Sequence, residues 1–140
     1  MTDITTTPES PATSPSSPAS LYERLGRSAG IRALVDDIVQ AHMENPAIRA
    51  RFLPYASDPE RLEVLAAHLR AFLEAGSGGP AQYAGRTMRD AHRGMNISEQ
   101  EYMAAIDDIL AVLERHHIDE ETRKDVLAIA YSLKGEILRL

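Results

Sequence analysis

From Leu21 onwards, apolar residues recur at steps of three and four along the chain, which is the period of an α-helix buried on one face. A short helix is predicted over 21–25, ending at Gly26. The first long run ends at Asn45-Pro46, and Ser28 is the expected cap at its start. No segment alternates convincingly as a strand would, so we expect an all-α domain. The buried face of the long run is predicted to be Ile31, Leu34, Val35, Ile38, Val39 and His42.

The next segment, residues 47–57, is expected to form an irregular corner. A second long helix follows, with Pro59 in its first turn and Asp58 or Ser57 as its cap. It ends at the glycine-rich stretch 76–80, where the backbone is free to turn. The apolar stripe of this helix is Leu62, Leu65, Leu69, Phe72 and Leu73.

Two further helices are predicted in the last third of the chain. Ser98 and Glu101 form a capping-box pattern, and the helix behind them carries Tyr102, Ile106, Ile109, Leu110 and Leu113. The last helix begins near Asp119 and is expected to bury Val126, Leu127, Ile129, Ala130, Leu133 and Ile137. Because these helices differ in length and in the loops between them, we expect steep crossings around a pocket instead of an up-and-down bundle.

The first twenty residues have a different composition from the rest. Fourteen of them are Ser, Thr or Pro and none is aromatic, so residues 1–20 are predicted to be a disordered tail and 21–140 the folded domain. The chain has no basic start followed by an apolar run and no stretch long enough to span a membrane. A cytoplasmic protein without a membrane partner is therefore expected. We also expect a monomer or weak dimer.

Composition excludes several classes of chemistry. The chain has no cysteine, which removes disulfides, thiolate nucleophiles, iron–sulfur clusters and cysteinyl zinc sites. A net charge of −6 without a clustered basic face argues against a nucleic-acid partner. The chain lacks the pattern of two histidines and one carboxylate, so a non-haem metal enzyme is not predicted.

The candidate chemistry lies in residues 85–94, GRTMRDAHRG, whose apolar side chains are only Met88 and Ala91. A segment this short and polar is predicted to form one or two helical turns between longer helices. His92 on such a segment can bind a haem iron as its permanent axial ligand, with the other ring N–H given to a backbone carbonyl of its own turn. The alternative is an ordinary surface or core histidine.

Several motifs in their order resemble group I of the truncated haemoglobins over residues 21–138. They are LYERLG at 21–26, Phe52 after the first long helix, AHLRAFL at 67–73, GGP at 78–80, and the run from Tyr83 to His92. The resemblance implies a truncated globin, a two-over-two helical sandwich around haem b, with His92 as the proximal iron ligand.

The resemblance also implies roles for other residues. Phe52 would pack on the haem face, although ordinary core packing also accounts for it. Arg86 and Arg89 would either meet the haem propionates or remain solvated. The pocket walls would come from Leu65, Leu69, Phe72, Leu73, Met88, Ala105, Ile109 and Ile129.

The chain departs from the family pattern on the distal side. Val39 and Leu69 stand where members that hold oxygen tightly usually carry a tyrosine and a glutamine, and neither side chain can donate a hydrogen bond. His68 stands where cyanobacterial members carry a histidine that can bind the iron; it would either do the same or pair with a propionate. Gly26-Arg27 replaces the usual Gly-Gly.

The expected function is reversible binding of oxygen, nitric oxide or carbon monoxide at a haem iron. Because the usual distal donors are absent, we expect nitric oxide, peroxide or redox chemistry with an external reductase, such as nitric oxide dioxygenation, more than oxygen storage. The cyanobacterial members that this chain resembles can bond a C-terminal histidine to a haem vinyl group. No histidine follows His117 here, so the resemblance implies a non-covalent haem. The alternative is a haem-free helical interaction or signalling domain on the same scaffold.

Overall fold

Helices make up the regular structure of the residues that this computed structural model describes, namely 19–80, 82–83 and 85–140. The long helices are α2 (Arg27–Glu44), α4 (Pro59–Gly76), α6 (Glu99–Arg115) and α7 (Glu120–Ser132). The short ones are α1 (Leu21–Arg24), η1 (Arg49–Phe52), α3 (Leu53–Ala56), α5 (Met88–His92) and α8 (Lys134–Ile137). The tail prediction falls largely on residues 1–18, outside the described part.

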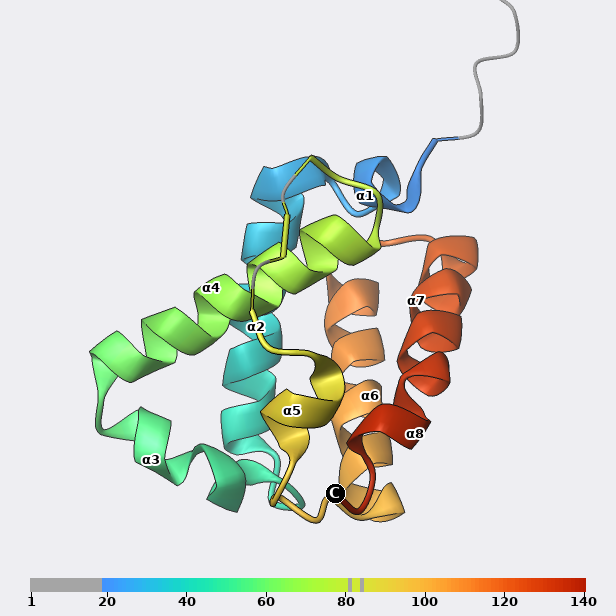
Figure 1. Ribbon diagram of the computed structural model, residues 1–140. Helices are drawn as coiled ribbons and strands as arrows, with labels where there is room; N and C mark the ends of the chain where they lie inside the picture. Colours follow the sequence, from blue (N-terminus) through green and yellow to red (C-terminus); the bar gives the residue numbers. More distant parts are fainter. Residues whose placement is uncertain (1–18, 81, 84) are drawn as a thin grey trace, which may run out of the picture.

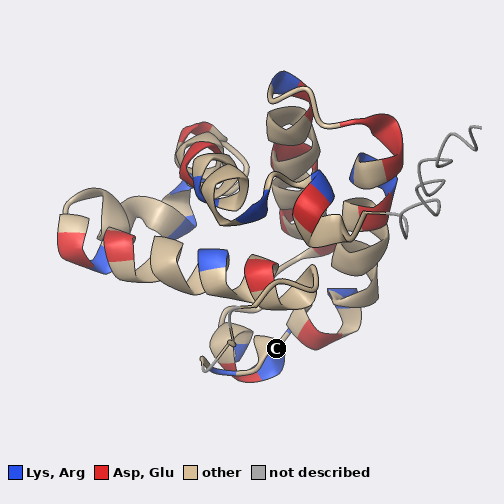
Figure 2. Cartoon of the chain, turned by 90° about the horizontal axis from the view of Figure 1, so that it is seen from above, with Lys and Arg blue, Asp and Glu red and all other residues tan. Residues whose placement is uncertain are grey.

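The central helix is α2, which packs against both α4 and α6. α4 crosses α2 at a steep angle, whereas α6 and α7 run side by side (Figure 1). These two pairs are the layers of the predicted helical sandwich. No helix in the described part is long and apolar enough to span a bilayer. Acidic and basic positions are interspersed along the helices seen from above (Figure 2).

The buried residues form two separate clusters. All six positions predicted for the inner face of α2 are buried, and five of them belong to the first cluster. The first cluster is Leu25, Ile31, Leu34, Val35, Ile38, Val39, Ala66, Val112 and Leu113. The second is Ile97, Tyr102, Ile106 and Ile137, with Met88 of α5 packed against it. The two clusters lie toward opposite ends of α6.

Helix starts follow the capping signals closely. The side chain of Asp58 accepts a hydrogen bond from the amide of Arg61 at 3.1 Å, which settles the cap left open between Ser57 and Asp58. The capping box of Ser98 and Glu101 is present at the start of α6. Each cap satisfies backbone donors that the first helical turn leaves without partners.

Three expectations were wrong. Ser28 lies inside α2 and does not cap it. Its Oγ is hydrogen-bonded to the Tyr22 hydroxyl at 2.8 Å, and its amide donates to the same hydroxyl at 3.1 Å. The corner at 47–57 contains η1 and α3 and is more helical than expected. The last helix is interrupted at Leu133, and Ile129, predicted to be buried, is 37% exposed.

Candidate functional site

His92 is the last residue of α5, and the sequence around it explains why the helix is so short. The hydroxyl of Thr87 caps its start by accepting a hydrogen bond from the amide of Asp90 at 3.1 Å. After His92 the backbone turns extended at Arg93 and then left-handed at Gly94, with φ at +85°. Glycine adopts that conformation without the steric cost of a side chain.

The imidazole of His92 is half-buried and held in one orientation. Its Nδ1 lies 2.7 Å from the carbonyl oxygen of Met88, one turn earlier in the same helix. A carbonyl only accepts hydrogen bonds, so Nδ1 carries the proton and the lone pair of the neutral ring is on Nε2. This is the bond predicted from the sequence, and it leaves Nε2 available as a ligand.

The segment after α5 is tied to the end of the chain. The amide of Asn96 donates to the carbonyl of Leu140 at 2.8 Å, and that of Arg139 donates to the carbonyl of Ile97 at 3.0 Å. α5 itself packs on α8. Together these contacts seat the helix that carries His92 against the C-terminal part of the fold.

Several large apolar side chains of η1, α4, α5 and α6 are only partly buried. Neither phenylalanine, Phe52 of η1 or Phe72 of α4, belongs to the buried core. Half-buried side chains also come from α4, α5 and α6: Leu65, Leu69, Met88 and Ile109. Half-buried phenylalanines on η1 and α4, with half-buried aliphatic side chains on α4, α5 and α6, suit a flat apolar ligand. With one available imidazole nitrogen, this donor set fits haem.

His68 lies on α4 with an exposed side chain. Its ring meets the edge of the Tyr83 ring at a centroid distance of 6.5 Å, and Phe72 meets Tyr83 at 5.4 Å. The Tyr83 hydroxyl donates to the carbonyl of Arg86 at 2.8 Å. Tyr83 therefore links α4 to the loop that leads into α5.

The remaining predicted positions are of two kinds. Val39 is 5% exposed and belongs to the first core cluster, against which Leu69 and Ile109 pack. Arg86 and Arg89 are exposed and lie just before and within α5. The side chains at Val39 and Leu69 are apolar, so neither position provides a hydrogen-bond donor.

An ion pair joins the Phe52 side of the fold to the His92 side. Arg51, next to Phe52, donates to both carboxylate oxygens of Glu101 and to the carbonyl of Met95, the latter at 2.9 Å. The hydrogen bond from Arg51 lowers the pKa of Glu101 from 4.5 to about 2. The sequence signal for Glu101 was its capping box; its partner Arg51 was not identified.

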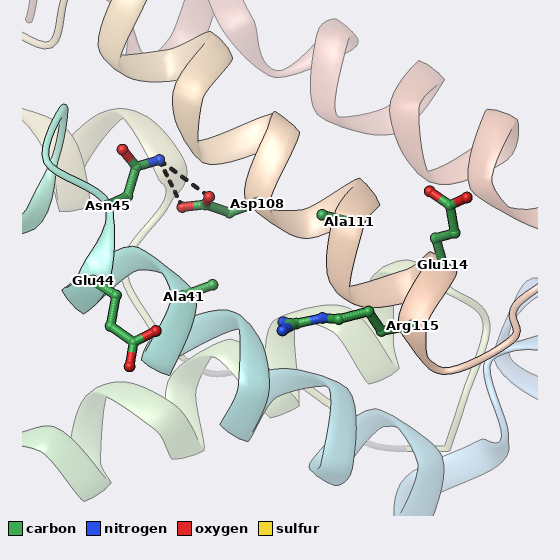
Figure 3. Close-up of a pocket in the computed structure, with 7 residues that line it drawn as sticks. All are labelled: Ala41, Glu44, Asn45, Asp108, Ala111, Glu114 and Arg115. Carbon is green, nitrogen blue, oxygen red and sulfur yellow. Dashed lines mark hydrogen bonds between the residues drawn. The ribbon is translucent and has the colours of Figure 1, made fainter.

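Sequence reasoning also missed the partner of His42. This buried histidine of α2 has its Nδ1 2.8 Å from Oδ2 of Asp108 on α6. The two residues are 66 positions apart, and a pattern with helical period carries no information on such a pairing. Asp108 also lies at a solvent-open cavity of about 510 Å³ between α2 and α6 (Figure 3), which the predicted haem-contacting residues do not line.

Known proteins match this chain over almost its whole folded part. The sequence pattern of the family described as bacterial-like globin matches residues 20–139. The group 1 truncated hemoglobin of Synechocystis sp. is 28% identical over 116 residues, covering 80% of this chain and 90% of that protein. That of Tetrahymena pyriformis is 27% identical over 121 residues, covering 79% and 96%.

Solved structures agree with the fold. The truncated hemoglobin from Tetrahymena pyriformis, Fe(III) form, has a TM-score of 0.79 at 21% identity and covers 87% of this chain and 100% of its own. The 2/2 hemoglobin from Synechococcus sp., in the cyanomet state and with covalently attached heme, has a TM-score of 0.76 at 21% identity and covers 86% and 98%. The fold and the resemblance inferred from the sequence are confirmed.

Proposed function

This chain belongs to the bacterial-like globin family, and we propose that it binds haem b non-covalently and takes oxygen, nitric oxide or carbon monoxide at the iron. The observation that carries the proposal is His92, whose Nδ1 is committed to the carbonyl of Met88 at 2.7 Å. That bond supports the tautomer in which the lone pair of Nε2 is available to bind iron. When bound, the haem supplies reversible binding of a diatomic ligand and one-electron chemistry.

The residues around His92 would hold the cofactor by apolar contact. Phe52, Leu65, Leu69, Phe72, Met88 and Ile109 are half-buried and gain contact area when a flat apolar ring covers them. Arg86 and Arg89 are exposed and long enough to meet the two propionates. One relative has covalently attached heme, but no histidine follows His117 in this chain, which supports non-covalent binding.

The distal side would be apolar except for His68. Val39 and Leu69 cannot donate a hydrogen bond to a ligand, so tight retention of oxygen is not favoured. His68 would reach the iron only after leaving its contact with Tyr83. Competition by His68 would reduce the apparent affinity for gases by the fraction of closed sites. We therefore favour nitric oxide or redox chemistry, with an external reductase, over storage.

Haem binding is tested by titrating the purified, haem-free chain with haemin and recording its absorption spectrum. We expect saturation at one haem per chain and a red protein that gives up its haem to acidic organic extraction. A chain that shows no stoichiometric haem spectrum would favour a helical interaction domain on a globin scaffold.

The role of His68 is tested by His68→Ala. The control is His117→Ala, at an exposed histidine just after the end of α6. If His68 binds the iron, ferric and ferrous spectra of the unligated wild type are low-spin and those of His68→Ala are high-spin. His117→Ala should match the wild type. An unchanged ferric spectrum in His68→Ala rules out direct ligation.

A further inference from the structure

His42 of α2 and Asp108 of α6 form a largely buried polar pair where the two helices pack. Their side chains are 10% and 17% exposed, and Nδ1 of His42 lies 2.8 Å from Oδ2 of Asp108. An ionised carboxylate only accepts hydrogen bonds, so the imidazole donates. If one partner of such a pair is removed, the other loses its hydrogen bond without regaining its hydration. The packing of α2 on α6 that keeps the pair together is therefore favoured.

Asp108 also accepts hydrogen bonds from Asn45, the C-cap residue of α2. The amide group of Asn45 donates to Oδ1 and Oδ2 of Asp108 at 3.0 and 3.1 Å (Figure 3). The Asn45 side-chain oxygen accepts from the amide of Ala47 at 3.0 Å, and its backbone carbonyl accepts from Ile48 and Arg49 at 3.1 and 2.7 Å. One carboxylate on α6 therefore fixes the turn that leads directly into η1.

Phe52, the last residue of η1, lies against the same network. The centroid of its ring is 5.5 Å from that of His42, with 34° between the two planes. The ring of Tyr55 lies 6.4 Å away on the following turn. Phe52 is thus placed in two ways: by its ring contact with His42 and by the turn that Asn45 begins.

We propose that Asp108 is a positioning residue for Phe52, acting through His42 and Asn45, and that this network sets how the haem lies against Phe52. This inference rests on the proposed function, because Phe52 is taken to pack on the haem face. Asp108 does not itself touch the haem. Its loss lets the η1 corner shift, so the haem settles in both of its two possible orientations and dissociates faster.

The test compares Asp108→Ala with Asp107→Ala, the exposed acidic neighbour on the same helix. Proton NMR of the ferric cyanide form measures the ratio of the two haem orientations, and transfer to an excess of apomyoglobin measures the rate of haem loss. We expect Asp108→Ala to lose haem about tenfold faster, as for a lost hydrogen bond to a charged group, and to change the orientation ratio. Asp107→Ala should match the wild type.

A second measurement uses the haem-free chain. Amide hydrogen exchange of Ala47, Ile48 and Arg49 should speed up about tenfold in Asp108→Ala, because the turn that these amides close is released. Asp108→Asn keeps one acceptor oxygen and the side-chain volume, so its effects should lie between those of Asp108→Ala and the wild type. This variant keeps the test decisive if Asp108→Ala folds poorly.

The route through Phe52 is tested in a Phe52→Leu background. There, adding Asp108→Ala should change haem loss by less than about twofold, because coupled residues are not additive. Equal effects in both backgrounds, or Asp108 variants that match Asp107→Ala in haem loss, orientation and exchange, would overturn the inference. Failure of the proposed function is read separately, from a wild-type chain that takes up no haem.

Discussion

At the scale of single residues, Arg27 holds a conformation that favours glycine. Its φ is +61°, directly after Gly26 at +94°, so both residues lie in the left-handed region where α2 begins. The second position of this turn is therefore filled by a residue with a side chain in a conformation that glycine adopts without steric cost. A residue with a Cβ in this region costs about 1–2 kcal/mol.

Arg27→Gly is therefore expected to stabilise the folded chain by about 1 kcal/mol. The gain is reduced by the flexibility that glycine adds to the unfolded chain and by the loss of the exposed pair with Glu23, at 3.6 Å. Urea unfolding followed by circular dichroism measures the difference. Ala29→Gly, in the same turn, is the control and should destabilise; a loss of stability in Arg27→Gly would show that the left-handed turn is not strained.

The pair of Arg51 and Glu101 predicts a pH dependence. The folded-state pKa of Glu101 is lowered from 4.5 to about 2, so its contribution is complete above about pH 4.5 and is lost as the pH falls towards 2. Glu101→Gln should cost about 1 kcal/mol at neutral pH, as one partly exposed, charge-assisted pair does, and less as the pH falls through that range.

The measurement is the free energy of unfolding of both chains at several pH values. Glu114→Gln, at the other end of α6, is the matched control and should leave the pH profile in place. A difference between wild type and Glu101→Gln that stays constant from pH 7 to pH 2 would contradict the assigned ion pair.

At the scale of elements, α5 is too short to be stable as an isolated helix. Five residues form too few hydrogen bonds to offset helix nucleation, so α5 depends on its cap, on α8 and on the link from Asn96 to Leu140. The position of His92 is consequently a property of these contacts as well as of its own segment.

Thr87→Ala removes the hydroxyl that caps α5 and should weaken the placement of His92. Loss of an N-cap costs about 1 kcal/mol, which corresponds to roughly fivefold faster haem loss if all of it acts on the bound state. Thr87→Ser keeps the hydroxyl and should restore the wild-type rate. Similar rates for Thr87→Ala and Thr87→Ser would indicate that α8, and not the cap, sets the position of α5.

The helices were predictable because their signals are local. The cap at Asp58, the capping box at Ser98 and the three-four period of α2 each lie within one segment, and each is confirmed. The errors arose where the outcome depended on a contact outside the helix itself or on a short element without a periodic signal. The Tyr22 hydroxyl took Ser28 from its expected role as a cap, and η1 and α3 formed where only a loop was expected.

The candidate site was predictable only in part, because some of its contacts join residues far apart in the sequence. The bond from His92 to Met88 spans one helical turn and was expected from the sequence. The pairs of His42 with Asp108 and of Arg51 with Glu101 join segments 66 and 50 residues apart, and their formation depends on how the helices cross. Periodicity places a residue on a face, but it does not identify the residue opposite.

At the scale of the whole molecule, the two core clusters leave apolar side chains of α4, α5 and η1 partly exposed. α4 belongs to the first cluster through Ala66, and α5 packs on the second through Met88. A ligand that contacts Phe52 and Phe72 and is bound by His92 would connect the parts of the fold built on the two core clusters. We therefore propose that haem is part of the structure of this globin, with His92 as its attachment.

The most direct test of that claim is the iron–histidine stretching band in the resonance Raman spectrum of the ferrous, unligated protein. It is recorded in a His68→Ala background, so that His92 is the only candidate ligand from the site. We expect a band that is present with His92, absent in His92→Gly, and restored there by added imidazole. A band of unchanged frequency and intensity in His92→Gly without imidazole would contradict the claim.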